Sequence, residues 1–295
     1  PIANAGNDAI ICEDVGYTLS GTVSNEQNIL WTTAGDGTFD DATIVGATYT
    51  PGVSDIGSGS VIITLTAYSI TPCTVDSVDT MVLTIQDLPV ANAGADDQVC
   101  ETESYTLSGV ASDQQSVLWT TSGDGGFDDA TIPGAAYTPG TNDISSGSVI
   151  LTLTSFAIAP CASDSSDSMT LTIQYAPTAN AGVDDVVCET ESYTLSGVAI
   201  YEQSILWTTA GDGTFDDASL LGATYTPGIN DIAAGTVDLT LTANAISPCA
   251  TDDNDIIKLT IQPLPIANAG TDATICEDAA YTLSGVVSNE QNLLW

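Results

Sequence analysis

The sequence predicts an all-β protein that is a tandem array of small β-sandwich domains. The first observation is an internal repeat, because the same cysteine and tryptophan positions return every 88 residues. The second is a series of short segments in which polar and apolar residues alternate, separated by Gly and Pro turns. The recurring markers are Cys12, Cys100, Cys188 and Cys276, with Trp31, Trp119, Trp207 and Trp295.

Prolines mark the expected domain boundaries. They divide the chain into repeats at 1–88, 89–176 and 177–264, followed by the N-terminal fragment of a fourth repeat at 265–295. A linker of residues 86–88 joins the end of the last predicted strand to the proline that opens the next repeat. Such short linkers favour a semi-rigid array, and we expect further copies of the repeat in the parent chain or fibre.

Within the first repeat, β-branched and aromatic residues alternate with polar ones in six segments. The predicted strands are residues 9–12, 17–23, 28–33, 47–50, 60–69 and 80–86. Gly-rich turns separate them, and residues 54–56 are expected to form one helical turn capped by Ser54 or Asp55. The prediction is two packed sheets of six to seven strands.

Each complete repeat contains two cysteines at a constant spacing, which indicates an oxidising, extracellular compartment. The spacing favours one disulfide per domain, worth about 4 kcal/mol in the chain-entropy model. A pairing of Cys73 with Cys100, which would tie neighbouring repeats together, is the alternative. Zinc is disfavoured because there is no CxxC motif and no His. The expected pairs are Cys12–Cys73, Cys100–Cys161 and Cys188–Cys249, with Cys276 unpaired in the fragment.

The charge is strongly negative, with 39 acidic residues, one Lys and no Arg or His, a formal net charge of −38. Nucleic acid is excluded as a partner, since binding to phosphates requires Lys and Arg. Anionic membrane surfaces would repel the chain, and no apolar run is long enough for direct membrane insertion. The simplest interpretation of this charge is a solvated surface that keeps the protein soluble.

Clustered aspartates also make Ca²⁺ a candidate structural ion, because it prefers several oxygen ligands. The densest cluster is the GDGTFDDA segment and its two copies, although it lacks the EF-hand spacing. A second candidate is the start of each repeat, for example Asn4 and Asp8, where turn capping is the simpler interpretation. The candidate metal ligands are Asp36, Asp40, Asp41, Asp124, Asp128, Asp129, Asp212, Asp216 and Asp217.

The tryptophans Trp31, Trp119 and Trp207 are expected to anchor the domain cores and to pack against the disulfides. An exposed Trp that stacks on sugar is the alternative. Catalysis has few suitable groups, since no His or Arg is present and Lys258 occurs only in the third repeat. We therefore predict that the chain is not an enzyme and needs no catalytic cofactor.

The segment WTTAGDG at residues 31–37 resembles the tryptophan-to-GDG signature of PKD domains. With the ANAG, ICED, LSG and LTLTA stretches, the repeat is similar to the PKD-like or immunoglobulin-like repeats of large Bacteroidetes surface proteins. The resemblance implies type IX secretion, attachment at the bacterial cell surface, and adhesion or gliding motility. It also implies O-glycosylation of Asp-Ser/Thr-apolar triplets, here at Ser77, Thr80 and Ser168.

Three functions follow from these observations. The leading hypothesis is a non-catalytic structural segment, a stalk or extracellular filament of a secreted surface adhesin. The second is a multivalent array in which each repeat weakly binds surface glycans or proteins of other cells. The third is a filament subunit that polymerises by strand complementation, with the incomplete fourth repeat receiving strands from another chain.

Overall fold

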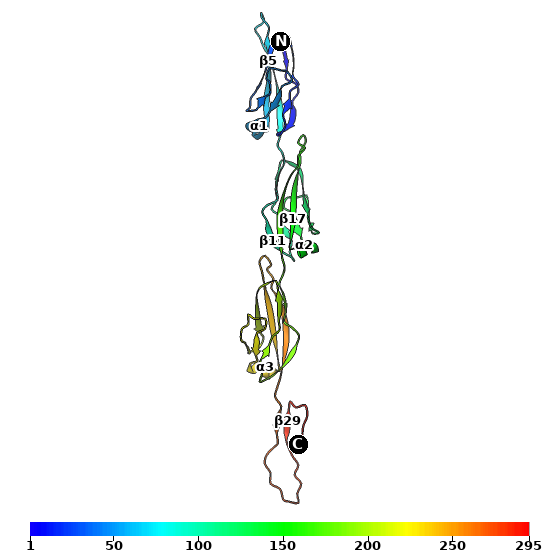
Figure 1. Cartoon of the computed structure of the whole chain (residues 1–295), viewed down its shortest axis with the longest axis vertical. Coiled ribbons are helices and arrows are strands. Elements are labelled where there is room, and N and C mark those ends of the chain that lie inside the picture. Colours follow the sequence, from blue (N-terminus) through cyan, green and yellow to red (C-terminus); the bar gives the residue numbers. More distant parts are fainter. Residues whose placement is uncertain (295) are drawn as a thin grey trace. The chain divides into compact units, whose positions relative to one another are not determined.

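The computed structural model describes residues 1–294; Trp295, the fourth tryptophan of the repeat pattern, lies outside the described residues. The chain divides into two compact units, residues 1–99 with 103–173, and residues 100–102 with the chain from 174 onward. The same order of strands and one short helix recurs with the period of the sequence repeat. Figure 1 shows each complete repeat as a bundle of strands with its helix at one end.

The first repeat contains nine strands and one helix. Its elements are β1 (Ile2–Asn4), β2 (Ala9–Cys12), β3 (Tyr17–Thr18), β4 (Thr22–Ser24), β5 (Glu26–Thr33), β6 (Thr38–Phe39), β7 (Thr48–Thr50), α1 (Val53–Ser58), β8 (Ser60–Ser69) and β9 (Ser77–Gln86).

The second and third repeats have the same elements, and the fragment keeps two strands. The second has β10 (Val90–Asn92), β11 (Asp97–Cys100), β12 (Tyr105–Thr106), β13 (Val110–Ser112), β14 (Gln114–Thr121), β15 (Gly126–Phe127), β16 (Ala136–Thr138), α2 (Thr141–Ser146), β17 (Ser148–Ala157) and β18 (Ser165–Gln174). The third has β19 (Thr178–Asn180), β20 (Asp185–Cys188), β21 (Tyr193–Thr194), β22 (Val198–Ile200), β23 (Glu202–Thr209), β24 (Thr214–Phe215), β25 (Thr224–Thr226), α3 (Ile229–Ala234), β26 (Thr236–Ala245) and β27 (Asp253–Gln262). The fragment has β28 (Ile266–Asn268) and β29 (Val286–Ser288).

Each complete repeat is a sandwich of a four-stranded and a three-stranded sheet. In the first repeat the larger sheet has the order β2-β9-β8-β5 and the smaller one β3-β7-β6, while β1 pairs with β4. The β2–β9 pair is parallel, with Cys12 opposite Gln86, so both strands end at the same edge. The all-β sandwich prediction is confirmed. Each predicted strand overlaps an observed one, although the strand predicted at 17–23 is divided into β3 and β4, and β1 and β6 had no matching prediction.

The core forms between the two sheets because alternate residues of the long strands point inward. In β8, Val61, Ile63 and Leu65 are buried while Ile62 faces outward. Trp31 on β5 is 1 % exposed and belongs to the same cluster as Tyr49 from the smaller sheet. Burial of these large side chains holds each sandwich closed.

Candidate functional site

The disulfides join neighbouring repeats, so the predicted pairing within each repeat is wrong. Cys12 bonds to Cys161 and Cys100 bonds to Cys249, each over a sequence separation of 149 residues. The first disulfide lies within the first compact unit and the second within the second. The alternative of Cys73 with Cys100 is also wrong. Among the described residues, the predicted one disulfide per domain is replaced by one per pair of successive repeats.

The physical reason is the position of the second cysteine in the fold. Cys161 lies in the hairpin tip at 158–164, between β17 and β18. The tip is held by a turn in which the Cys161 N–H donates to the Ile158 carbonyl, and by Asp164, which accepts the Ala157 N–H at 2.9 Å. Cys12, at the end of β2, lies beside the last residue of β9. The hairpin tip of the second repeat therefore contacts the end of the first repeat at which β2 and β9 finish.

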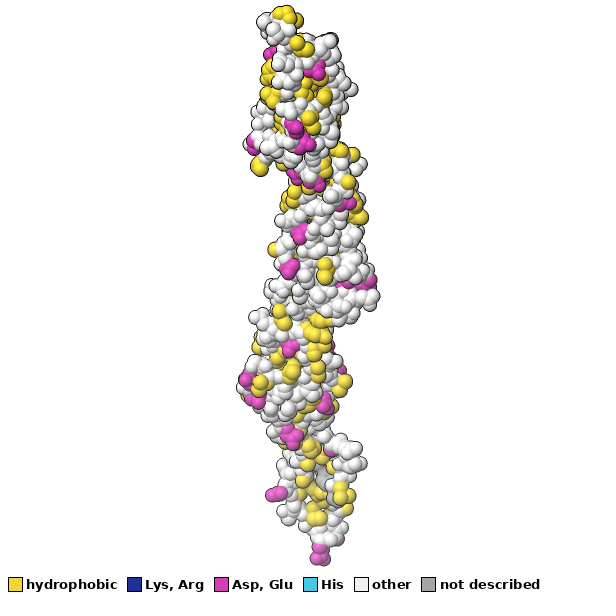
Figure 2. Space-filling view, turned by 45° about the horizontal axis from the view of Figure 1, so that its top comes forward, with side chains coloured by type: hydrophobic (Ala, Val, Ile, Leu, Met, Phe, Trp, Pro, Cys, Tyr) yellow, Lys and Arg dark blue, Asp and Glu magenta, His cyan; other side chains and the backbone are white. Residues whose placement is uncertain are grey.

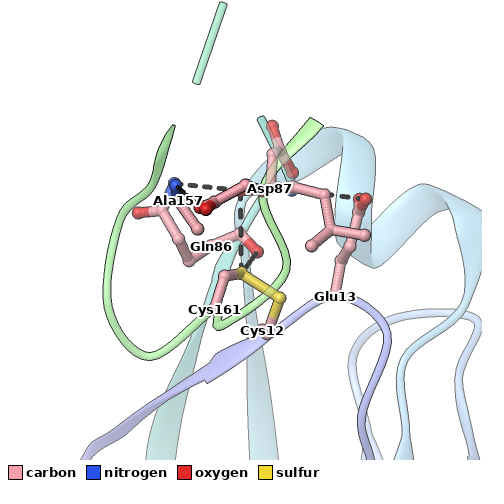
Figure 3. The surroundings of a disulfide bond; sticks show 8 residues. Cys12, Glu13, Gln86, Asp87, Ala157 and Cys161 are labelled. Carbon is pink, nitrogen blue, oxygen red and sulfur yellow. Dashed lines mark hydrogen bonds between the residues drawn. A yellow bond between two sulfur atoms is a disulfide. The ribbon is translucent and has the colours of Figure 1, made fainter. Parts of the chain in front are cut away.

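The Cys12–Cys161 bond is one part of a junction that includes the linker (Figure 3). Cys161 Sγ lies 3.3 Å from the Gln86 carbonyl oxygen. The Glu13 N–H donates to the same carbonyl at 3.0 Å, and the Glu13 carboxylate accepts the Leu88 N–H at 3.3 Å. The start of the linker is thus held by hydrogen bonds as well as by the disulfide.

The Cys100–Cys249 junction repeats this arrangement within the second unit. The Glu101 N–H donates to the Gln174 carbonyl at 2.9 Å, and the Glu101 carboxylate accepts the Ala176 N–H at 3.0 Å. Cys249 Sγ lies 3.5 Å from the Gln174 carbonyl. Because the same contacts occur twice, the junction is a recurring feature of the repeat and not an accident of one boundary.

Three cysteines are free thiols: Cys73, Cys188 and Cys276. Cys73 occupies the same hairpin-tip position as Cys161 and is exposed. Cys188 occupies the same edge position as Cys12, beside an open cavity of about 580 Å³ that Gln262, Leu264 and Asn289 also line. Cys276 was predicted to be unpaired in the fragment, whereas Cys73 and Cys188 were predicted to be bonded, and the bonds predicted for these two are absent from the described residues.

The aspartate of the GDG turn, Asp36, caps the helix. Asp36 Oδ1 and Oδ2 each accept the Ser54 N–H at 3.1 Å, at the N-terminus of α1. The N-cap residue is Gly52, which has no side chain to supply this bond. The prediction that Ser54 or Asp55 would cap the helix is confirmed in part: the Asp55 carboxylate accepts the N–H of the N-cap residue Gly52. The N–H groups of the first helical turn are satisfied by Asp36 from a distant turn and not by Ser54.

A buried aspartate, Asp55, is the central polar group between the GDG turn and α1. It was predicted only as a possible helix cap and not as a site residue. Asp55, 2 % exposed, accepts the Tyr49 hydroxyl at 2.6 Å and the N–H groups of Gly37 and Gly52 at 3.0 and 3.1 Å. Gly35 is required here, since a Cβ on it would overlap the Asp55 carboxylate. The signal in the sequence was the aspartate that follows GDG at the same distance in all three repeats.

Hydrogen bonds of this kind shift the titration of Tyr49 in the first repeat and of the aspartates Asp143 and Asp231 in the second and third repeats. Burial, followed by the hydrogen bond to Asp55, raises the pKa of Tyr49 to about 12. In the second repeat, burial of Asp143 is the largest influence and acts to raise its pKa. The hydrogen bonds from Tyr137 and from backbone N–H groups outweigh it, so the pKa of Asp143 is lowered. The carboxylate is thus kept charged as a structural acceptor.

The remaining aspartates of the cluster hold turns. Asp40 accepts the N–H groups of Thr48 and Asp41, both at 2.7 Å, and the Thr48 bond is the main cause of its lowered pKa. Asp41 accepts the Thr43 hydroxyl at 2.6 Å. The copies accept equivalent bonds: Asp124, Asp128, Asp129, Asp212, Asp216 and Asp217.

Within residues 1–294, the structure has no group of three or more acidic, Cys or His side chains arranged to hold a metal ion. At the start of the repeat, Asn4 accepts the Gly6 N–H and Asp8 accepts the Val82 N–H. These side chains are engaged with backbone. The calcium site therefore stays a prediction without a preformed ligand set.

The tryptophans lie in the interior. Trp119 and Trp207 are 2 % and 1 % exposed, and the Trp31 and Trp119 indole N–H groups donate to the carbonyls of Ile44 and Pro133 at 3.1 Å. None of the three can stack on a sugar from solution. The prediction that they pack against the disulfides is wrong: none of the three core clusters contains a cysteine, because the disulfides lie at the ends of the repeats.

The three glycosylation candidates differ in accessibility. Ser77 is half-buried, and its Oγ accepts the Ala3 N–H at 3.0 Å. Thr80 and Ser168 occupy the same position in successive repeats and are exposed, with Ser168 Oγ 2.8 Å from Thr152 Oγ1. Glycosylation stays a prediction, and Thr80 and Ser168 are the more accessible acceptors.

The surface carries scattered negative charge, and Figure 2 shows acidic side chains dispersed among polar and apolar ones. None of the helices among the described residues has the length and apolarity needed to cross a bilayer. The exposed face of the four-stranded sheet includes Ile10 and Ile62, which are 59 % and 49 % exposed.

Comparisons with known proteins find likeness only among solved structures. No protein-family model matches the sequence, and a search of the curated proteins finds no match. The structure is similar to mouse protocadherin-24 EC1–3, with 12 % identity, 88 % of this chain and 98 % of that chain covered, and a TM-score of 0.44. Extracellular cadherin domains 1–4 of protocadherin gamma B7 share 11 % identity, with 95 % of this chain and 80 % of that chain covered, and a TM-score of 0.45. The I9–I11 tandem of titin shares 12 % identity, with 88 % of this chain and 97 % of that chain covered, and a TM-score of 0.33.

Proposed function

We propose that this chain is a non-catalytic structural segment, a stalk or extracellular filament, of a secreted bacterial surface adhesin. The observation that carries the proposal is the junction, in which a disulfide and linker hydrogen bonds fasten one repeat to the next. Disulfides of this kind are typical of extracellular proteins. The bacterial cell surface is proposed from the sequence resemblance.

The chemistry of the described residues supports a structural role over catalysis. The chain has no His and no Arg, and the buried aspartates Asp55, Asp143 and Asp231 are engaged by tyrosine hydroxyls and backbone N–H groups. A general base needs a free lone pair directed at a substrate. These carboxylates instead hold the loops of each sandwich in place.

An image of the native particle, on cells or shed from them, tests the proposal. We expect a fibre one domain wide, with one globular density per repeat and continuous density at each disulfide junction. Strands that cross between chains would favour the polymerising subunit instead. A short, branched or globular particle would contradict the structural role.

A multivalent binding array is the second candidate, and the exposed apolar residues of the large sheet favour it. Ile62 and Ile150 occupy the same outward position and are 49 % and 50 % exposed, whereas the third repeat has Asp238 there. Glycan or protein binding that is abolished by Ile62→Asp with Ile150→Asp would support this function. An equal loss from Asp238→Asn would contradict it, because that variant leaves both isoleucines in place.

Calcium is proposed as an additional structural ion. If Ca²⁺ binds the GDGTFDDA loops, a chelator should lower the unfolding temperature of the full chain, and added Ca²⁺ should restore it. Asp41→Asn should weaken that response. An unchanged unfolding temperature in chelator would show that the aspartates serve only as acceptors for backbone groups.

A further inference from the structure

Each disulfide shortens the covalent path along the chain by far more than one repeat. Along the backbone, Cys12 and Cys188 are two full repeats apart. The Cys12–Cys161 bond bypasses 149 residues of this path, so that only the segment from Cys161 to Cys188 remains. Cys73 and Cys276 are connected in the same way through Cys100–Cys249, by the segments from Cys73 to Cys100 and from Cys249 to Cys276.

We infer that the staggered disulfides form a covalent strap that carries axial tension and prevents the repeats from lengthening the chain when they unfold. The strap from Cys12 to Cys188 consists of one disulfide, β18, the linker and β19 to β20. Residues 13–160, which include most of both sandwich cores, lie off this path. They can unfold without adding length while the disulfide is intact.

The offset between repeats matters for this effect. If each repeat had its own disulfide, the shortest path from Cys12 to Cys188 would contain two equal segments, Cys73 to Cys100 and Cys161 to Cys188. The observed pairing leaves only the second segment and so halves the length. A fully extended residue spans at most about 3.4 Å, so the two limits are about 90 Å and about 180 Å.

The same pattern gives each boundary between two complete repeats two covalent connections. The chain passes from the first repeat to the second through the linker that follows β9, and the Cys12–Cys161 bond crosses the same boundary. Cys100–Cys249 crosses the next one. A single break in a linker therefore does not separate the repeats. The strap deepens the proposed structural role and rests on it for its biological use, while its existence rests on the disulfide connectivity alone.

Single-molecule pulling on the full chain tests the strap, with handles attached through non-cysteine chemistry at Asp14 and Glu191, both exposed. With the strap, the path between the handles is about 32 residues, and extension should stop at about 110 Å. After reduction the path is about 177 residues, and extension should reach about 600 Å.

Two variants separate the contributions of the disulfides. Cys100→Ser leaves Cys12–Cys161 intact and should keep the limit of about 110 Å. Cys161→Ser leaves only Cys100–Cys249, so the path becomes about 144 residues and the limit about 490 Å. Because both variants remove one disulfide, a general loss of stability cannot explain a difference between them.

The maximum extension of the oxidised chain tests the inference, because each disulfide connectivity predicts a different limit. A limit of about 200 Å would show pairing within the repeats, and one near about 600 Å would show no strap; either overturns the inference. Failure of the proposed function can be distinguished from failure of the strap. If the chain is a binding array with the same disulfides, its extension would still stop at about 110 Å, but the native particle would not be a fibre.

Discussion

Residues 1–30 and 265–294 are identical at 24 of 30 positions, yet they differ in structure. Both form the short antiparallel pair at the start of the repeat, β1–β4 in the first case and β28–β29 in the second. Only the first forms β2 and β3, and the corresponding fragment residues form no strand. Leu19 is 2 % exposed, whereas its counterpart Leu283 is 57 % exposed.

The difference separates local from long-range structure. The strands β1 and β4 both lie between Ile2 and Ser24, so a short segment contains the whole pair. By contrast, β2 pairs with β9 and β3 pairs with β7, which lie later in the repeat than the fragment extends. At the positions of β2 and β3, nearly identical residues thus form strands only where a distant partner supplies the hydrogen bonds and the facing core.

The largest expected effect comes from supplying the missing partners. A chain extended after Trp295 by a second copy of residues 32–88 should form the missing strands at 273–276 and 281–282. Amide hydrogen exchange there should slow by at least about 1000-fold, as in a cooperative core. Cys188 should then bond to the added copy of Cys73. Unchanged exchange rates would show that the fragment cannot complete a repeat.

A matched pair of core variants measures the same difference in place. Leu19→Ala should destabilise the first repeat by about 3 kcal/mol, because it leaves a cavity in the buried cluster. Leu283→Ala should change stability by less than about 0.5 kcal/mol, since its side chain is exposed. Denaturant unfolding of the full chain provides the measurement. Equal costs would mean that the fragment is already packed.

The buried aspartates Asp143 and Asp231 make the second and third repeats sensitive to acid. The folded-state pKa values of Asp143 and Asp231 are lowered, so their contribution to stability is present above the unfolded value of about 3.9. It is lost as the pH falls through the folded values. Asp143→Asn should cost about 2 kcal/mol at pH 7 and reduce the acid sensitivity.

Thermal unfolding between pH 7 and pH 2 measures this effect, with Asp272→Asn in the exposed fragment as the control. The control should leave the pH profile unchanged, because the fragment contains no counterpart of the tyrosine and aspartate pair. A profile that is the same in Asp143→Asn and in the unsubstituted chain would contradict the role assigned to the carboxylate.

The smallest effect concerns a hydrogen bond from a side chain of β17 to β10, a strand of the local β10–β13 pair. Buried Ser155 donates to the Val90 carbonyl at 2.9 Å, while the other repeats have Ala67 and Ala243 at this position. Ser155→Ala should cost about 1 kcal/mol or less, since water can replace the donor to an exposed strand. Ala67→Ser is the reciprocal variant. Denaturant unfolding checks both, and a cost above about 2 kcal/mol for Ser155→Ala would mean that β10 depends on this contact.

The sequence by itself determined the all-β sandwich and the interior position of the tryptophans. A strict period, alternation in segments such as 60–69 and Gly-rich turns depend on neighbouring residues, which a sequence displays directly. The sequence also indicated the GDG aspartates as candidate site residues. Their role as acceptors for backbone N–H groups depends on the tertiary structure, which places Asp36 at the start of α1.

Only the tertiary structure decided which cysteines bond. In a strict repeat, pairing within a repeat and pairing with the next one have the same period, so both connectivities are equally regular along the sequence. The choice depends on the direction in which the hairpin tip points. Cys161 lies at the end of β17 that faces the preceding repeat, and Cys12 lies at the closing edge of that repeat beside Gln86. A disulfide requires neighbouring Cα atoms, here 4.8 Å apart, and the packing of the two repeats sets that distance.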